Sequence, residues 1–308
     1  MSDRTWTLTV HGGSGRFERG IIPAEADAGA RAGLGRALDA GSAVLAAGGT
    51  AVDAVQAAIE VLEDDPHFNA GRGAALSGEG RIELDAAIMD GRAREAGSVA
   101  QVTTPRHPIA LARAVMDEGT HVMLAGPGAE AFAAARGVEA ADAGWFELPE
   151  RRRQLEELLA RGNDAFDVDM KYGTVGAVAR DANGHVAAAT STGGVTGKRW
   201  GRIGDSPLIG AGTWADDACA VSATGAGEYF VRVGAGRTIA ARVKMLGESI
   251  GTATDAVLGE IVALGGTGGL IVVAPSGETA WRFSTPGMYR ATASAEGARV
   301  VAIYGDEE

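Results

Sequence analysis

The order of the predicted elements favours an α+β fold in which antiparallel sheets are covered by helices. Turn-forming residues separate pairs of β-rich segments at Asp90-Gly91, Asn183-Gly184 and Pro275-Ser276-Gly277, which predicts hairpins. Amphipathic segments with a helical period also come in pairs, one pair in each half of the chain. Hairpins and helix pairs in separate blocks do not follow the strict strand–helix alternation of a parallel doubly wound sheet.

In the first half of the chain, a β-rich strand at residues 5–10 leads into the loop His11-Gly12-Gly13-Ser14-Gly15. Two helices follow, and Thr50 is the expected N-cap of the second, because its hydroxyl can accept from an N–H group of the first turn. The expected helices are residues 24–47, 52–63, 108–118 and 130–135, and the further strands are 81–89, 98–102 and 122–124.

Residues 144–172 differ in character from the rest of the chain. The charged run 151–159 is able to form a helix, but residues 161–169 have no hydrophobic period and many loop formers, so we expect an exposed connector. Regular alternation returns at Thr174. The expected strands of this half are 174–180, 185–191, 208–213, 218–223, 270–274, 279–283 and 299–304, and its helices are 228–246 and 254–264.

The composition excludes several classes of function. The 308 residues suffice for one or two domains, and 28 Lys and Arg against 40 Asp and Glu give a net charge of −12, so nucleic acid is not an expected partner. No apolar run reaches the roughly 20 residues of a membrane span. With Cys219 as the single cysteine, we expect a cytoplasmic protein without disulfides. The 47 glycines and the low aromatic content, 5%, indicate tight turns and close approach of backbones.

Several motifs of other enzyme classes are incomplete. Gly197-Lys198 lacks the Ser or Thr that follows the lysine of a P-loop, and the five histidines have no spacing typical of zinc sites. Gly247-Glu248-Ser249-Ile250-Gly251 matches the nucleophile elbow of serine hydrolases, which requires a strand before it and a helix after it. Both flanks are predicted to be helical, so we expect a turn between helices. A serine-triad hydrolase that uses Ser249 is the second enzyme class considered.

The junction Gly173-Thr174 has the form that one kind of nucleophilic catalysis needs. A threonine hydroxyl is a weak nucleophile, and an adjacent α-amine can activate it as a base. That amine exists only if the chain is cut before the threonine, and its unperturbed pKa of about 8 leaves a neutral fraction near pH 7. A connector that ends in glycine before a strand that starts with Thr174 meets these requirements.

Four segments around this junction together resemble the plant-type asparaginase, or isoaspartyl peptidase, family of N-terminal-nucleophile hydrolases. They are Gly173-Thr174-Val175-Gly176-Ala177-Val178-Ala179, Thr190-Ser191-Thr192-Gly193-Gly194, Gly201-Arg202-Ile203-Gly204-Asp205-Ser206-Pro207 and Thr224-Gly225-Ala226-Gly227-Glu228. Further matches, in family order over nearly the whole chain, are His11-Gly12-Gly13, Phe68-Asn69-Ala70-Gly71, Glu83-Leu84-Asp85-Ala86, Met89-Asp90-Gly91, Gly265-Gly266-Thr267-Gly268-Gly269 and Gly287-Met288-Tyr289-Arg290.

The resemblance implies a single domain, residues 1–308, folded as a four-layer αββα sandwich with two antiparallel sheets between helix layers. It also implies a precursor that cuts itself between Gly173 and Thr174 into subunits 1–173, with the connector at about 150–173, and 174–308. In this reading Thr174 is the nucleophile, Thr192 hydrogen-bonds its hydroxyl, Thr224 and the Gly225 N–H form the oxyanion hole, and Asn69 assists self-cleavage. The His11 motif is expected to be architectural.

The implied substrates are isoaspartyl dipeptides and L-asparagine, which present a free α-carboxylate and a free α-ammonium. Arg202 suits the carboxylate because its planar guanidinium can bind it with two hydrogen bonds, and Asp205 suits the ammonium. Gly225 and Gly227 are expected to add backbone contacts. Taken alone, Arg202 and Asp205 would be read as a surface ion pair.

No cofactor is expected for catalysis. The resemblance implies a structural sodium ion held by backbone carbonyls, and a homodimer of cleaved protomers. The carbonyls assigned to sodium are those of Leu62, Glu63, Asp65, Phe68, Ala70 and Arg72.

Some positions depart from the family pattern. Ala226 stands where many relatives have Thr or His, Arg72 where an aliphatic residue is common, and Ser284-Thr285-Pro286 replaces a more usual Asn-Thr-Glu. A glycosylasparaginase-like amidase is the nearest alternative, disfavoured because Gly193 stands where those enzymes usually have Asn. A non-catalytic protein that binds an amino acid through Arg202 and Asp205 is the alternative from a different class.

Overall fold

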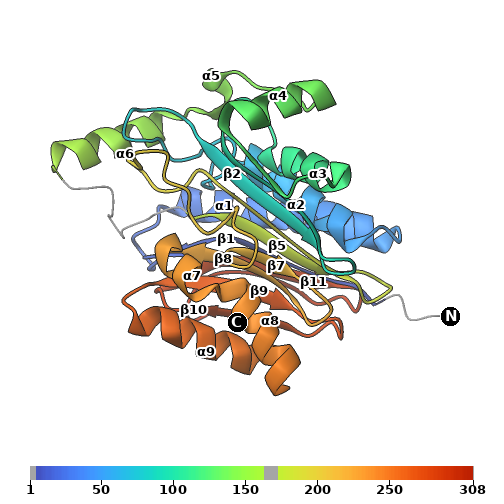
Figure 1. Cartoon of the computed structure of the whole chain (residues 1–308). Helices are drawn as coiled ribbons and strands as arrows, with labels where there is room; N and C mark the ends of the chain where they lie inside the picture. The colour runs from blue at the N-terminus through green and yellow to red at the C-terminus, as the bar shows by residue number, and fades with distance from the viewer. Residues whose placement is uncertain (1–4, 163–172, 308) are drawn as a thin grey trace.

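Two sheets stacked face to face, each covered by helices on its outer side, form the computed structural model, which describes residues 5–162 and 173–307 (Figure 1). The larger sheet has the strand order β12-β11-β1-β5-β6-β2-β3-β4, and the smaller one β10-β9-β8-β7. This arrangement confirms the predicted α+β, four-layer sandwich. Its strands pair antiparallel, as predicted, except at one edge, where β3 and β4 are parallel.

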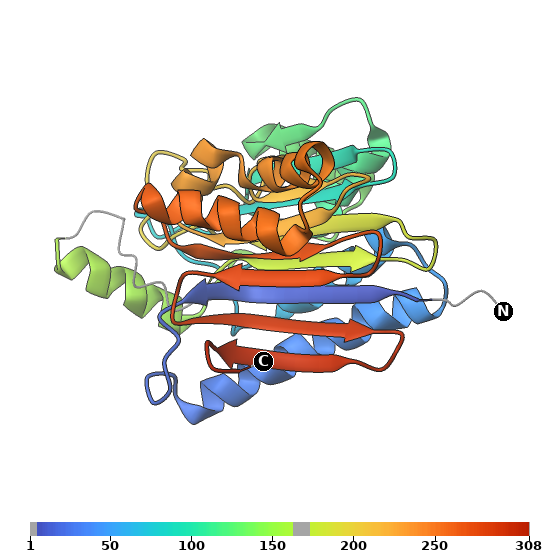
Figure 2. The same ribbon diagram turned by 90° about the horizontal axis from the view of Figure 1, so that it is seen from below.

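The strands of the first half are β1 (Thr7–Gly15), β2 (Leu84–Asp90), β3 (Glu95–Val102) and β4 (Met123–Ala125). Those of the second half are β5 (Val175–Arg180), β6 (Val186–Thr192), β7 (Thr213–Ala215), β8 (Ala220–Gly225), β9 (Gly268–Val273), β10 (Thr279–Phe283), β11 (Gly287–Ser294) and β12 (Arg299–Tyr304). Figure 2 shows that β1 lies beside β11, so segments from both ends of the chain meet in one sheet.

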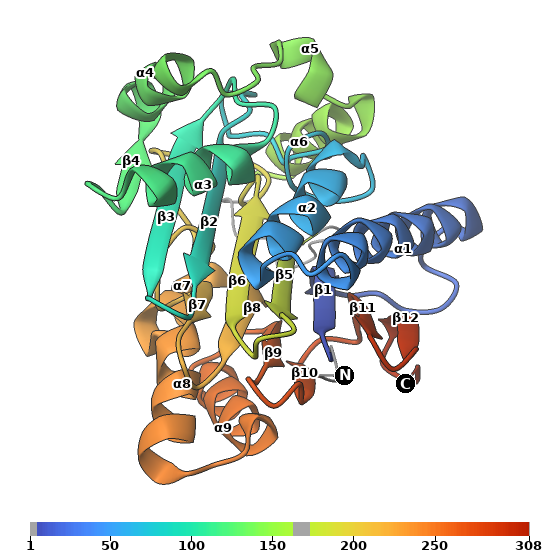
Figure 3. The same cartoon turned by 90° about the vertical axis from the view of Figure 1, so that its right-hand side faces the viewer.

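The helices divide between the two outer faces. Figure 3 shows α1, α2 and α3 lying across the larger sheet, whereas α7, α8 and α9 cover the smaller one. Their bounds are α1 (Ala24–Ala46), α2 (Ala51–Asp64), α3 (Pro108–Glu118), α4 (Gly126–Arg136), α5 (Ala143–Phe146), α6 (Pro149–Ala160), α7 (Gly227–Val233), α8 (Ala235–Leu246) and α9 (Ile250–Ala263). Thr50 is the N-cap of α2, as predicted, and accepts from the Asp53 N–H.

Alternation along the strands sorts the buried side chains into layers. In β1, Leu8 and Val10 belong to the core under the helices, whereas His11 turns toward the smaller sheet and contacts Ser222. Apolar side chains, small ones such as Ala188 and Ala220 and larger ones such as Met288, fill the layer between the sheets. Polar side chains on the same faces also meet between them.

The structure corrects several predicted elements in the second half. The helix expected at 228–246 is broken into α7 and α8 at Gly234, whose φ of 60° ends the first helix. Residues 208–212 do not form a strand but make turns, with the Leu208 N–H bonded to the Asp205 carbonyl, and the strand begins only at Thr213. Strand β11 was not predicted.

The expected exposed connector is also corrected in part. Residues 149–160 form helix α6, which buries Arg151, Leu155 and Leu158 against the rest of the fold. The Arg151 side chain donates to the Gly73 and Phe68 carbonyls, which ties this helix to the 62–73 loop. Residues 163–172 of the predicted connector lie outside the described residues.

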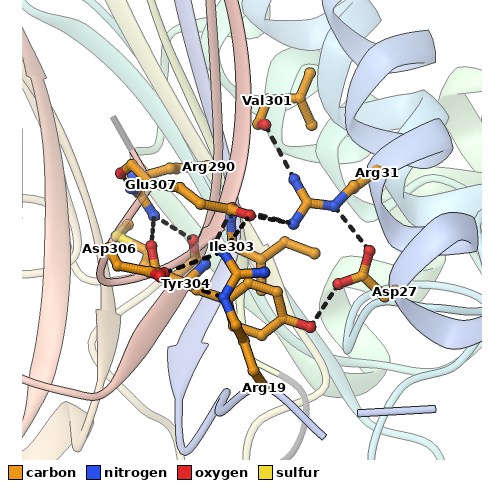
Figure 4. Close-up of polar contacts among 10 residues, drawn as sticks. Arg19, Asp27, Arg31, Arg290, Val301, Ile303, Tyr304, Asp306 and Glu307 are labelled. Carbon is orange, nitrogen blue, oxygen red and sulfur yellow. Dashed lines mark hydrogen bonds and ion pairs between the residues drawn. The ribbon is translucent and has the colours of Figure 1, made fainter. Parts of the chain in front are cut away.

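The C-terminal residues are tied to α1 by a cluster of charged side chains (Figure 4). Arg31 donates to both carboxylate oxygens of Glu307, at 2.7 and 3.0 Å, and to Asp27 at 2.8 Å. The Glu307 carboxylate also accepts from the Ile303 N–H at 2.7 Å. Burial alone would raise the pKa of Glu307, but these hydrogen bonds lower it to about 2.

Within the described ranges, no helix combines the length and apolar character that crossing a bilayer requires.

Candidate active site

Thr174 stands directly before strand β5, at one end of the layer between the sheets. Its hydroxyl donates to the Thr192 hydroxyl at 3.0 Å, and the Thr192 oxygen also accepts from the Gly194 N–H at 3.0 Å. Strands β5 and β6 pair with Val175 opposite Ser191, so the sheet register itself brings Thr174 and Thr192 together.

The bond before Thr174 lies in tight contact with the glycines near the end of β1. A Cβ atom placed on Gly13 would lie 2.3 Å from the Gly173 Cα, and φ of Gly13 is +108°, so only glycine fits there. The Thr224 hydroxyl is close as well, 3.1 Å from where a Cβ of Gly173 would be. That hydroxyl is buried and has no hydrogen-bond partner among the described residues.

A small, open pocket lies beside Thr174. It brings together most of the residues that the sequence assigns to the site, although they come from five separate segments of the chain. The lining residues are Asn69, Thr174, Thr192, Gly194, Val195, Arg202, Gly204, Asp205, Ser206 and Gly225. Thr224 and Gly227 lie just behind this lining, since Thr224 precedes Gly225 and a Cβ on Gly227 would be 2.7 Å from Asp205 Oδ1.

The two charged residues of the pocket are not paired with each other. Arg202 donates from Nε to Glu228 Oε1 at 2.8 Å and from Nη2 to Oε2 at 3.0 Å. Asp205 is 3% exposed, and its Oδ2 atom has no hydrogen-bond partner in the described structure. Burial raises the pKa of Asp205 to about 7, against the opposing effect of the nearby Arg202. The interpretation as a local ion pair is therefore wrong, and a buried carboxylate is left facing a pocket.

Asn69 fixes the turn that follows Thr192. Its Nδ2 donates to the Gly194 carbonyl at 2.7 Å, and its Oδ1 accepts from the Ala75 N–H at 2.7 Å. The Asn69 carbonyl also accepts from the Gly193 N–H at 3.0 Å. These contacts hold the turn whose Gly194 N–H hydrogen-bonds the Thr192 oxygen.

The 62–72 loop brings several backbone carbonyls close together. The Arg72 N–H donates to the Glu63 carbonyl at 2.6 Å, which closes the loop. A Cβ on Gly71 would lie 2.4 Å from the Glu63 oxygen, and one on Gly73 would lie 2.8 and 2.9 Å from the Phe68 and Pro66 oxygens. Carbonyl oxygens gathered in this way are suitable ligands for a hard cation. Among the described residues, no group of three or more His, Cys, Asp or Glu side chains could hold a metal ion.

Arg72, one of the departures from the family pattern, stacks on Trp145 of α5. Its guanidinium carbon lies 4.7 Å from the ring centroid, and that of Arg106 lies 4.6 Å from the same ring. Two guanidinium groups on one indole account for a charged residue in place of an aliphatic one, because the ring provides both apolar contact and cation–π attraction.

Ser249 is not at a nucleophile elbow. It is the exposed N-cap of α9 and accepts from the Thr252 N–H at 3.1 Å, with helix α8 before it. The predicted turn between helices is confirmed, and the strand that a serine-hydrolase elbow requires is not there.

Sequence reasoning missed three features of the site. Glu228 was noted only as part of a motif, although it holds Arg202. Asp85 lies opposite Thr192 in the sheet and is buried close to Lys198, whose amine donates to the Glu83 carbonyl at 2.6 Å. His11 contacts the backbone of Thr174. All three depend on contacts between distant segments, which sequence spacing does not reveal.

A four-layer sandwich with a threonine at the start of an inner strand, next to a pocket between the two sheets, defines an N-terminal-nucleophile hydrolase fold. The chain belongs to the asparaginase family, whose sequence model matches residues 4–303. The chain is 44% identical over 306 residues to an isoaspartyl peptidase of Salmonella typhimurium, covering 96% of this chain and 98% of that one. It is 39% identical over 324 residues to a probable isoaspartyl peptidase/L-asparaginase of Arabidopsis thaliana, with 97% and 99% covered. A human isoaspartyl peptidase/L-asparaginase is 41% identical over 284 residues, 91% of each chain. These matches confirm the resemblance drawn from the motifs.

Proposed function

We propose that this protein is a self-cleaving threonine hydrolase that acts on isoaspartyl dipeptides and, as a second substrate, on L-asparagine. The observation that carries the proposal is the 3.0 Å contact between the Thr174 and Thr192 hydroxyls, beside a pocket that holds Arg202 and the unpartnered Asp205. The names of the similar proteins agree with this substrate class.

Self-cleavage would begin with attack of the Thr174 hydroxyl on the Gly173 carbonyl carbon. The acyl group moves from nitrogen to oxygen, and water then hydrolyses the ester to give a Gly173 carboxylate and a free Thr174 α-amine. Support comes from the unpartnered Thr224 hydroxyl next to Gly173, which is placed to donate to the oxyanion that forms. Asn69 would assist by fixing the Gly193–Gly194 turn.

In substrate hydrolysis, the freed amine would take the Thr174 hydroxyl proton as the oxygen attacks the side-chain carbonyl of the substrate. The Thr224 hydroxyl and the Gly225 N–H would stabilise the oxyanion, with each donor worth about 3 kcal/mol in other hydrolases. The leaving amine takes the proton and departs as ammonia or as an amino acid. Water then hydrolyses the β-aspartyl ester on Thr174, which releases aspartate and restores the hydroxyl.

The pocket charges suit the invariant part of these substrates. Arg202 would bind the α-carboxylate, Asp205 the α-ammonium, and Gly225 and Gly227 would add backbone contacts. The unpartnered Oδ2 of Asp205 supports this assignment, since a buried carboxylate oxygen without a partner is costly until a cation reaches it.

We extend the proposal to a sodium ion in the 62–72 loop, bound by carbonyls of Leu62, Glu63, Asp65, Phe68, Ala70 and Arg72. The carbonyls crowded around Gly71 and Gly73 support it. Replacing NaCl by choline chloride at equal ionic strength should lower the thermal midpoint. A thermal midpoint that did not change over a range of sodium concentrations would contradict a stabilising sodium ion in this loop.

We further propose that the cleaved protomers form a homodimer in the cytoplasm. The single cysteine, Cys219, is buried and forms no disulfide, which agrees with a reducing compartment. Light scattering of the purified protein measures the assembly.

The proposed function is tested by incubating the purified protein with isoaspartyl dipeptides, L-asparagine and an N-glycosylated asparagine. We expect release of aspartate from the first two, loss of activity in Thr174→Ala, and retention in Ser249→Ala. Turnover of the glycosylated substrate alone would favour a glycosylasparaginase. Binding of asparagine without any product would favour the non-catalytic alternative, and loss of activity in Ser249→Ala would favour the serine hydrolase.

A further inference from the structure

A fully buried histidine holds the main chain of Thr174. His11 is 0% exposed, in the layer between the sheets. Its Nδ1 lies 3.0 Å from the Thr174 carbonyl oxygen, and its Nε2 lies 3.0 Å from the Ser222 hydroxyl on the smaller sheet. One imidazole therefore joins β1, the start of β5 and β8.

The position of the imidazole depends on Gly176. His11 and Gly176 face each other in the register of β1 and β5. A Cβ on Gly176 would lie 2.1 Å from His11 Nε2 and 2.1 Å from the Ser222 oxygen, too close for any side chain. The missing side chain lets the histidine ring cross β5 and reach the second sheet.

Beyond Ser222, a chain of buried hydroxyls continues across the inner layer. The Ser222 and Thr190 oxygens lie 2.7 Å apart, and the Thr213 hydroxyl contacts Thr190 at 2.7 Å. The Thr213 oxygen also lies 3.0 Å from the carbonyl of Ser206, which lines the substrate pocket next to Asp205. The chain thus runs from the backbone of Thr174 to the loop that carries the pocket carboxylate.

Strand alternation explains why this chain lies under the active site. Thr190 is two residues before Thr192 in β6, and Ser222 is two residues before Thr224 in β8. Residues two apart on a strand share a face, so the hydroxyls of the chain lie on the same faces as those proposed to act on the substrate.

Proton positions in the chain follow from the partners at its ends. A carbonyl only accepts, so His11 Nδ1 carries the proton that reaches Thr174. Burial lowers the pKa of His11 to about 3, so the ring is neutral and Nε2 accepts from Ser222. The single proton of Ser222 therefore points to His11, and the Ser222 oxygen can accept from Thr190. Thr213 has one proton and two acceptors within reach, the Thr190 oxygen at 2.7 Å and the Ser206 carbonyl at 3.0 Å, and donates to one of them.

We infer that His11 is a positioning residue for the nucleophile, held in one orientation by the Ser222–Thr190–Thr213 hydroxyl chain. The inference rests on the proposed role of Thr174 as nucleophile. Fixing the Thr174 carbonyl fixes ψ of this residue, and with it the directions in which its α-amine and hydroxyl point. This matters most after cleavage, when Thr174 no longer has a peptide bond to Gly173. Misplacement of a reacting group by about 1 Å can cost about a hundredfold in rate.

Two substitutions of His11 separate its two contacts. In His11→Asn the side-chain amide can replace the Nδ1 donor to Thr174, whereas in His11→Gln it reaches the Nε2 position and Ser222. We expect His11→Asn to keep kcat within about fivefold of the wild type and His11→Gln to lose about twentyfold or more, with KM within about twofold in both. If both variants lost kcat equally, or if His11→Gln kept the higher kcat, the inference would be overturned. Either result is what we expect if His11 only fills space between the sheets.

A second pair of variants covers the case in which the His11 variants do not fold or cleave. Ser222→Ala removes the donor to Nε2 and should lower kcat by about three- to tenfold at unchanged KM. The matched control is Thr9→Val, which removes a buried hydroxyl on the same face of β1 as His11. That hydroxyl is hydrogen-bonded to Thr292, and its loss should leave kcat unchanged. Equal kinetics of these two variants would contradict the inference.

A measurement independent of turnover separates the two proposals. The ¹⁵N side-chain NMR signals of His11 in the wild type should show a proton on Nδ1 throughout pH 5–8. A proton on Nε2, or titration of the ring within this range, would contradict the inference even in an active enzyme. Absence of β-aspartyl turnover with an Nδ1-protonated His11 would instead reject the proposed function alone.

Discussion

Glu228 holds the Nε and Nη2 atoms of Arg202 with two hydrogen bonds, of 2.8 and 3.0 Å. A substrate carboxylate would then bind along the Nη1 and Nη2 edge of the guanidinium. Burial alone would lower the pKa of Arg202, but the Glu228 carboxylate raises it, so the cation is firmly maintained. Glu228 therefore orients the cation that we assign to the substrate carboxylate.

Glu228→Gln tests this arrangement. The substitution keeps the size of the side chain but removes its charge and one acceptor, so the guanidinium is held less firmly. We expect KM to rise about tenfold while kcat changes less than about threefold, as for loss of a binding contact. Steady-state kinetics on an isoaspartyl dipeptide give both values.

The control is Glu248→Gln. Arg242 and Glu248 form an ion pair of the same geometry, with distances of 2.8 and 2.7 Å, between α8 and the turn after it. Loss of that pair should leave KM unchanged. Equal effects of the two substitutions would mean that Glu228 acts on stability and not on binding.

Thr192 is expected to act through its hydroxyl. Thr192→Val keeps the shape of the side chain but removes the acceptor for the Thr174 hydroxyl, so we expect kcat to fall by about a hundredfold. Thr192→Ser retains the oxygen and should keep most of the activity. Comparable activity of the Val and Ser variants would show that the 3.0 Å contact has no catalytic role.

Asp205 should lower the stability of the empty protein at neutral pH. Its pKa is raised from 3.8 to about 7 in the folded state, so the folded protein binds the proton more tightly than the unfolded chain. The contribution of Asp205 to the free energy of unfolding therefore becomes less favourable as pH rises from about 4 to about 7. We expect Asp205→Asn to raise the free energy of unfolding at pH 8 by between about 1 and 4 kcal/mol, and much less at pH 4.

Urea unfolding of wild type and Asp205→Asn at these two pH values gives the difference. The exposed Asp255, paired with Arg282 at 2.6 Å, provides the control Asp255→Asn, which should change stability by less than about 0.5 kcal/mol at pH 8. The Asp205 variant should also fail to bind substrate. If Asp205→Asn were less stable than the wild type at pH 8, Asp205 would not be a destabilising buried charge in the empty protein.

Glu307 should have the opposite dependence on pH. Its folded pKa of about 2 lies below the ordinary 4.5, so its contribution is fully present above about pH 4.5 and is lost as pH falls toward 2. Because the carboxylate is partly exposed, we expect Glu307→Gln to cost only about 1 kcal/mol at pH 7. The difference from wild type should shrink at pH 3. Glu278→Gln, at an exposed turn, serves as control, and a constant difference across this range would contradict the cluster in Figure 4.

The sequence predicts the elements that have strong local signals. Helices α1, α2 and α3 and the hairpins β5–β6 and β9–β10 follow from hydrophobic period and turn residues, and their bounds agree within a few residues. The break at Gly234 is not predicted, although glycine is common at helix ends, because the apolar period continues on both sides of it. Strand β11 is composed largely of small residues, and the glycines of 208–213 make turns in a segment whose apolar residues indicate a strand.

The residues of the candidate site are predictable from the sequence, but the partners that orient them are not. Thr174, Thr192, Arg202 and Asp205 come from motifs, and the structure brings all four into one pocket. The partners that orient them do not come from spacing, since Glu228 is 26 residues from Arg202 and His11 is 163 residues from Thr174. The pairing of β1 with β5 and the stacking of the two sheets create these contacts, and both are properties of the whole fold.

The central claim is that Thr174, as a freed N-terminus, carries the acyl group during turnover. It is tested most directly by mixing the enzyme with an isoaspartyl dipeptide, quenching in acid within the first turnover, and measuring intact masses. We predict two chains, residues 174–308 and a chain that ends at or shortly before Gly173. Part of the 174–308 chain should carry one added β-aspartyl group, which peptide mapping places on Thr174. A single uncut chain that still turns over substrate, or an aspartyl adduct on another residue such as Ser249, would contradict the account.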